Sequence, residues 1–336
     1  MRRMTEEYSS PFQMWMGGNL LIGIYDPQQA KHILRNRNCI DKSIMYKLAE
    51  PLFGMGLLTA PASIWTRIRK IAAFTFSPSM LQNFFKIFVE ESEILVHQLQ
   101  KNDLNGNEID LHDHISNCSW RMACGSLMGI KLEQEKNKEY VKAIQRLKNN
   151  IIYRVRNKLF FDCIFYITAL GRNHKKDTDF INSLSDEMIQ QLTHDLNNPN
   201  TKDGNSRTHR TFFEILTEAS RKNNFTREEI HDNVMTMLLG ANDTITSLIN
   251  FVTFLLGSFP EVQEKVYKEL CEIYGTKSTK DAPVMYEDLQ YMCYLDGVIK
   301  ETMRIFPTVP LISRKATKDI KIGLFFFLHS YLNYLL

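Results

Sequence analysis

Hydrophobic positions recur with a helical period along most of the chain, whereas strand-like runs are confined to its beginning. The segment 12–25 has apolar runs on either side of Gly17-Gly18, which predicts a β-hairpin. A helix is predicted from Pro78 to beyond Leu99, because apolar side chains fall near one face throughout it. The pattern therefore predicts a mainly α protein with a small antiparallel β portion.

Prolines and capping residues mark where several other helices begin. Proline suits the first helical turn, and a polar residue before it can accept hydrogen bonds from the free N–H groups. The pattern favours a short helix over 26–34, a loop with about one helical turn over 41–62, helices within 109–129 and 136–170, and a loop over 196–207.

The longest predicted helix begins at a capping box, Thr226-Arg-Glu-Glu229, and can continue to Phe259. At about 1.5 Å per residue it is about 50 Å long, which is enough to cross a whole domain. Two further helices are predicted over 260–274 and 288–306, each bounded by a proline.

Composition excludes several classes of protein. Among the 336 residues, 44% are hydrophobic and 24% are charged, with a net charge of +3, so no strongly basic face for nucleic acid is expected. Six cysteines without a CxxC pair indicate reduced thiols, not a disulfide scaffold. No signal peptide is apparent, and no uninterrupted run of about 18 apolar residues predicts a spanning helix.

The middle of the long helix carries polar residues inside an apolar run. Asp243 and Thr244 follow Gly240 and Ala241, whose small side chains leave space on one face. The Thr244 hydroxyl can also bond the carbonyl four residues earlier. Because buried polar groups need hydrogen bonds, two interpretations stay open. The segment is a notch for a flat cofactor or an oxygen species, or a polar patch facing water or another helix.

Two further pairs are spaced to act together. Glu301 and Arg304 can pair at i,i+3, and the apolar residues around them predict a buried pair, although a solvated pair is the usual outcome. Trp65 and Arg69 share a helix face, where an indole N–H and a guanidinium would suit a ligand carboxylate. Arg314 follows an extended segment with prolines. A solvated basic surface is the alternative for these last three residues.

In this order and spacing, the motifs resemble the cytochrome P-450 superfamily of heme-thiolate monooxygenases, and most closely its family-4 clan with insect members. The resemblance covers about residues 8–323. It implies that Trp65, Arg69 and Arg314 bind heme propionates and that Ala241 contacts the cofactor. It also implies that Asp243 and Thr244 lie near dioxygen and deliver protons. Glu301 and Arg304 match the ExxR structural pair.

The resemblance also implies a domain division and departures from the family. We expect a partial cytochrome P-450 domain over 1–323 and a non-homologous apolar tail over 324–336. The fold would lack its C-terminal heme-ligand segment, because none of the six cysteines stands in the family's Phe- and Gly-rich loop. With no proximal cysteine, no metal ligand is assigned. We expect a fragment that is inactive as it stands.

The implied function is that of an oxidoreductase acting on paired donors with O₂. The family hydroxylates lipophilic substrates such as fatty acids, hormones or xenobiotics, using heme and electrons from NADPH through a separate cytochrome reductase. The resemblance further implies the endoplasmic reticulum membrane, on its cytosolic face. The competing hypothesis is a non-catalytic, truncated helical protein that binds lipid or a partner.

Overall fold

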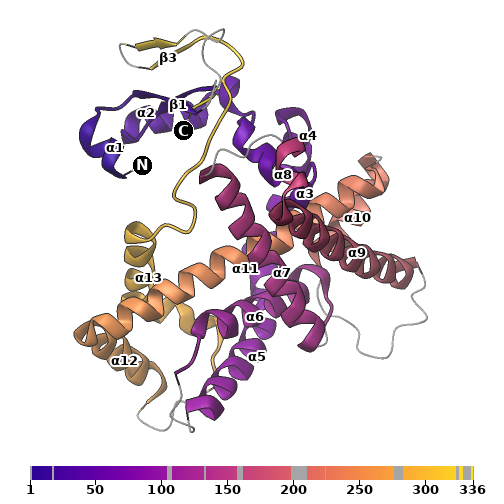
Figure 1. Cartoon of the computed structure of the whole chain (residues 1–336). Coiled ribbons are helices and arrows are strands. Elements are labelled where there is room, and N and C mark those ends of the chain that lie inside the picture. Colours follow the sequence, from indigo (N-terminus) through magenta and orange to yellow (C-terminus); the bar gives the residue numbers. More distant parts are fainter. Residues whose placement is uncertain are drawn as a thin grey trace.

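Helices make up most of the computed structural model, and the few strands come from the beginning and the end of the chain (Figure 1). The prediction of a mainly α fold with a small antiparallel β portion is confirmed. The structure describes residues 2–16, 19–103, 108–131, 134–156, 162–197, 210–223, 225–275, 283–322, 325–327 and 334–335.

The strands form two small sheets. The first sheet has the order β1-β2-β5, in which β1 and β2 are antiparallel and β5 runs parallel to β2. In the second sheet β3 and β4 are antiparallel. The predicted hairpin is confirmed, although its Gly17-Gly18 turn lies outside the described residues. The strands are β1 Phe12–Met16, β2 Asn19–Gly23, β3 Ile320–Ile322, β4 Phe325–Phe327 and β5 Tyr334–Leu335.

The helices whose starts a proline or a capping box predicts, α2, α5, α11 and α12, begin at those positions. Asp26 caps α2, and Thr226 with Glu229 forms the predicted capping box of α11. The α-helices are α1 Arg2–Glu7, α2 Pro27–Arg35, α3 Glu50–Phe53, α4 Ala62–Thr75, α5 Pro78–Asp103, α6 Leu111–Ala123, α7 Gln134–Arg156, α8 Asp162–Ile167, α9 Ala169–Asn197, α10 Phe212–Asn223, α11 Arg227–Ser258, α12 Pro260–Tyr274 and α13 Cys293–Ile305. The predicted loop over 196–207 falls mainly outside the described residues.

The prediction that one helix covers 288–306 is wrong at its start. Residues Tyr286–Tyr291 form a separate 3₁₀ helix, and α13 begins only at Cys293. The Glu269 carboxylate on α12 accepts hydrogen bonds from the N–H groups of Tyr294 and Leu295, at 2.6 and 2.9 Å. This acceptor comes from another helix, so the local pattern of residues could not reveal where α13 begins.

The core of the helical region surrounds the first half of α11. Large buried side chains of α6, α7, α10 and α11 meet there, among them Trp120, Tyr140, Phe213 and Leu238. A buried polar network fixes α6 to α11, because Asn242 Nδ2 donates to the Ser116 carbonyl and to Ser119 Oγ, both at 2.8 Å. By length and composition α11 could cross a bilayer, but in this fold it is the central helix.

A second, smaller core lies where the two ends of the chain meet. It joins Ile22 of β2 and Ile33 of α2 to Ile320 and Ile322 of β3. An extended segment rises from α13 to β3 and is yellow in Figure 1. Part of this segment, 314–317, lies along 38–42, since Lys315 N–H donates to the Asp41 carbonyl at 2.8 Å and Thr317 N–H to the Asn38 carbonyl at 2.9 Å.

Candidate heme site

Three residues that can bind an anion, Lys42, Trp65 and Arg314, are linked where the extended segment passes α4. Lys42 and Arg314 stand opposite each other in an antiparallel bridge. The Lys42 ammonium lies 6.0 Å from the ring centre of Trp65 on α4 and 5.5 Å from that of Tyr46. The structure thus brings together two of the predicted propionate residues, Trp65 and Arg314, through a lysine that the sequence analysis did not identify.

Lys42 and Arg314 form no ion pair with any residue that the structure describes. The neighbouring carboxylate of Asp41 accepts a hydrogen bond from Ala62 N–H at 2.7 Å, at the start of α4. Burial, and secondly the charge of Arg314, lower the pKa of Lys42 to about 8. Like charges placed opposite each other on neighbouring strands repel. An anion bound between them would relieve both the repulsion and the loss of hydration.

Arg69 stands apart from this cluster. It is exposed one turn after Trp65 on α4, and it makes no hydrogen bond or ion pair with the described part of the chain. Arg67, on the neighbouring face, is instead tied to α11, because it pairs with Glu229 and lies 4.3 Å above the ring of Phe225. The role of Arg69 remains a prediction.

The polar segment of α11 has the open face that its small residues predict. A Cβ added to Gly240 would meet no other atom within 4 Å. The Thr244 hydroxyl donates to the Gly240 carbonyl at 2.9 Å, which confirms the expected bond to the preceding turn. Ala241 packs against the helical core, so the open face belongs to Gly240 and Thr244, one turn apart. The helix is continuous through this segment.

Asp243 points to a partner that the sequence analysis missed. Its carboxylate pairs with the ammonium of Lys148 on α7, and both side chains are partly exposed. The two residues are 95 positions apart, so no local pattern indicates the contact. The pair joins α7 to the polar segment of α11 and leaves Asp243 in reach of solvent.

The ion pair between Glu301 and Arg304 forms, but the expectation that it is buried is wrong in this structure. Two hydrogen bonds of 2.6 and 2.7 Å join the guanidinium to the carboxylate. The side chains remain 70% exposed for Arg304 and 54% for Glu301. Their apolar sequence neighbours are also exposed in part, with Met303 at 40% and Ile305 at 46%. Among the described residues, nothing covers this face of α13.

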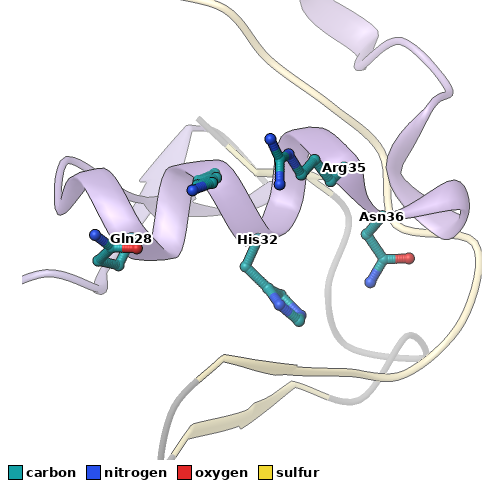
Figure 2. Close-up of a pocket in the computed structure, with 5 residues that line it drawn as sticks. Gln28, His32, Arg35 and Asn36 are labelled. Atoms are coloured by element: carbon teal, nitrogen blue, oxygen red, sulfur yellow. The ribbon is translucent and has the colours of Figure 1, made fainter.

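A groove of about 390 Å³ on α2 is separate from these residues (Figure 2). It is lined by Gln28, Lys31, His32, Arg35 and Asn36. Figure 2 shows that His32 and Asn36 point to one side of α2 and Arg35 to the other. Because these polar groups do not converge, the groove has no arrangement that would select a ligand.

Comparison with known proteins settles the family. A family model described as Cytochrome P450 matches residues 1–328. The chain belongs to the cytochrome P450 family. Human Cytochrome P450 4V2 is 32% identical over 333 residues, which are 95% of this chain and 63% of the human protein. Cytochrome P450 4c21 of Blattella germanica is 32% identical over 331 residues, which are 95% of this chain and 65% of that protein.

The fold agrees with this assignment. The crystal structure of the cytochrome P450DA heme domain superposes with a TM-score of 0.78 at 19% identity, covering 99% of this chain and 70% of that one. This P450 chain therefore has the family's fold, and it spans 63% of the length of the human relative. The predicted family, with its family-4 and insect relatives, is confirmed.

Heme is the prosthetic group that membership of the P450 family implies, and the residues on one side of the site fit it. Two cations without a carboxylate partner in the described part of the chain suit a pair of propionates, and open space beside Gly240 suits a flat ring. Three of the six cysteines, Cys39, Cys118 and Cys124, are buried. Burial raises the pKa of Cys39 and Cys118 to about 11 and also that of Cys124, which keeps these buried side chains as thiols.

Proposed function

We propose that this chain carries the propionate-binding and proton-delivering parts of a heme-dependent monooxygenase that hydroxylates lipophilic substrates. One observation carries the proposal: Lys42 and Arg314 pair in a backbone bridge, the Lys42 ammonium lies beside Trp65, and neither cation has a carboxylate partner among the described residues. Cations that are partly desolvated and near each other are costly unless an anion joins them. A heme propionate is the anion that the P450 family provides.

Heme, when bound to a proximal thiolate, supplies the oxygen chemistry in this family. Lys42, Trp65 and Arg314 would hold the propionates, and Gly240 would border the ring, with Ala241 next to it against the helical core. Arg69 would add a further cation to the same edge from α4. The axial ligand stays unassigned among the six cysteines of the chain.

Asp243 and Thr244 would hold and move a proton at the open face of α11. The Asp243 carboxylate is 44% exposed, so it can exchange protons with solvent, while Lys148 holds it in place. The Thr244 hydroxyl donates a hydrogen bond to the Gly240 carbonyl, and its oxygen keeps lone pairs free to accept a hydrogen bond. Rotation of the hydroxyl then presents a proton to the open side.

The proposal also covers the redox partner, the location and the substrates of the protein. An NADPH-dependent reductase would supply electrons, and the chain would act at the cytosolic face of the endoplasmic reticulum membrane on fatty acids, hormones or xenobiotics. Residues 1–323 would form part of the P450 domain and 324–336 an apolar tail of different origin, most of which lies outside the described residues. The family model matches residues 1–328, and the boundary at 323 stays a prediction.

Titration of the chain with hemin tests the proposal. We expect Lys42→Ala and Arg314→Ala each to weaken hemin binding about tenfold or more, because each removes one charge-assisted hydrogen bond. Lys47→Ala is the matched control, since Lys47 is exposed on the 3₁₀ helix Ile44–Ala49 and has no ion-pair partner in the described chain. Equal hemin affinity in all four proteins, or no uptake by the parent chain, would overturn the proposal.

A further inference from the structure

The loop 54–60, which precedes α4, is held by two consecutive side chains of α11. Asp232 Oδ2 accepts a hydrogen bond from Met55 N–H at 2.7 Å, and Asn233 Oδ1 accepts one from Leu57 N–H at 3.0 Å. Both side chains are buried, Asn233 completely. Asn233 is itself fixed, because its Nδ2 donates to the Glu229 carbonyl at 2.6 Å. Both hydrogen bonds are made by backbone N–H groups of the loop. They therefore fix the position of the loop independently of its side chains.

Two glycines of the loop lie so close to α11 that a side chain would not fit between them and the helix. Gly54 has φ +52°, and a Cβ there would lie 2.1 Å from the Asp232 carboxylate. At Gly56 a Cβ would lie 2.2 Å from Thr236 Oγ1 and 2.4 Å from the Asp232 carbonyl oxygen. The loop backbone therefore approaches the helix as closely as glycine alone allows.

The loop is closed on itself and leads directly into α4. Thr59 Oγ1 donates to the Gly54 carbonyl at 2.6 Å, and Ala60 N–H donates to the Gly56 carbonyl at 2.8 Å. Two residues later α4 begins, and it carries Trp65 of the cation cluster. A displacement of the loop would therefore displace the start of α4, since the short closed connection cannot absorb it.

The same helix carries the other half of the site. Asp232 and Thr244 are both on the continuous helix α11, about 18 Å apart at about 1.5 Å per residue. The N-terminal half of α11 holds the loop before α4 through Asp232 and Asn233, and α4 carries Trp65. The middle of α11 carries Thr244. One rigid element thus relates the anion-binding edge to the open face at Gly240.

We propose that Asp232 and Asn233 are positioning residues: by binding the backbone N–H groups of Met55 and Leu57, they set α4 so that Trp65, Lys42 and Arg314 converge on a heme carboxylate. This inference rests on the proposed function. Their role is to hold the loop 54–60 through its backbone, to which both side chains are bonded. Loosening the loop would therefore weaken recognition of the carboxylates while leaving the apolar ring site largely as it is.

Paired titrations with hemin and hemin dimethyl ester test this role, because the ester keeps the ring and lacks the propionate charges. We expect the parent chain to prefer hemin by about tenfold to a hundredfold, as charge-assisted hydrogen bonds allow. Asp232→Ala should lose most of this preference by binding hemin more weakly, with ester affinity unchanged within about twofold. Asp232→Asn, which keeps an acceptor oxygen for Met55, should retain it.

The control variant is Glu228→Ala, which removes an exposed carboxylate from the same helix and leaves the loop untouched. If Asp232→Ala keeps the full preference for hemin, or loses affinity for both compounds equally, the positioning role is wrong. If the parent chain shows no preference, the proposed propionate site itself is wrong. Should Asp232→Ala not fold, Asn233→Ala makes the same comparison through Leu57 and is judged by the same two results.

Discussion

Replacement of Asn242 by alanine tests whether the buried polar network fixes α11 to α6. The Asn242 side chain is buried, with 3% of its surface exposed, and its amide donates to the Ser116 carbonyl and to Ser119 Oγ. Ser119 Oγ also reaches the Asn242 carbonyl at 3.1 Å and Thr246 Oγ1 at 2.9 Å. Asn242→Ala removes the amide, so the Ser116 carbonyl loses this donor while Ser119 keeps two of its partners.

The cost follows from these contacts. A net hydrogen bond contributes about 1 kcal/mol, so the two bonds of the amide contribute about 2 kcal/mol, while the Ser116 carbonyl keeps its backbone hydrogen bond within α6. Ser119 also retains partners, so neither acceptor is left unpaired. The cavity left by the amide group adds to the total, because a packed interior closes it only in part. We expect Asn242→Ala to lower the free energy of unfolding by about 2–4 kcal/mol.

Equilibrium urea unfolding, followed by tryptophan fluorescence, measures this change, since Trp120 is buried on α6 beside the network. Thr253→Ala on the same helix is the matched control, because its exposed hydroxyl bonds only to the carbonyls of the preceding turn. We expect the control to lie within about 0.5 kcal/mol of the parent chain. A similar value for Asn242→Ala would refute the inference that this network holds the two helices together.

Three further predictions concern the loop, the cation cluster and the cysteines. In urea unfolding, Gly54→Ala should lower the free energy of unfolding by about 2 kcal/mol more than Gly275→Ala. Both positions have a positive φ, but only a Cβ at Gly54 would collide with α11. Equal losses of stability would contradict the close contact between the loop and the helix. Because the folded pKa of Lys42 is lowered to about 8, from about 10.4 in an unfolded chain, the unfolded chain binds more protons between these values. The free energy of unfolding should therefore increase as the pH rises from about 8 to about 10.4, and Lys42→Met should lack this increase. Identical dependence of the free energy of unfolding on pH in the parent chain and in Lys42→Met would contradict the lowered pKa of Lys42. Timed alkylation with peptide mass spectrometry should modify Cys163 and Cys293 first and the three buried cysteines only on unfolding; early labelling of a buried one would contradict the core packing.

Sequence patterns predict those features that local chemistry determines. The capping box at Thr226 and the proline at the start of α12 define helix ends through their own backbone groups, and both are found where expected. The Thr244 hydroxyl bond is equally local, since its acceptor is one turn away. Each of these features depends on neighbours within four residues, so the order of residues is sufficient.

Features that depend on distant segments could not be predicted in the same way. Lys42 joins Arg314 only because two extended segments lie side by side, and Lys148 joins Asp243 only because α7 lies against α11. The burial expected for Arg304 and its partner failed because surrounding apolar residues in the sequence do not guarantee a covering element in space. Tertiary contacts decide all three cases.

A crystal structure of the chain with bound hemin tests the central claim most directly. We expect both propionates within hydrogen-bonding distance of Lys42, Trp65 and Arg314, with the ring beside Gly240. Hemin bound at another surface, with its propionates in solvent, would contradict the assignment of this cluster as the anion-binding edge of a P450 heme site.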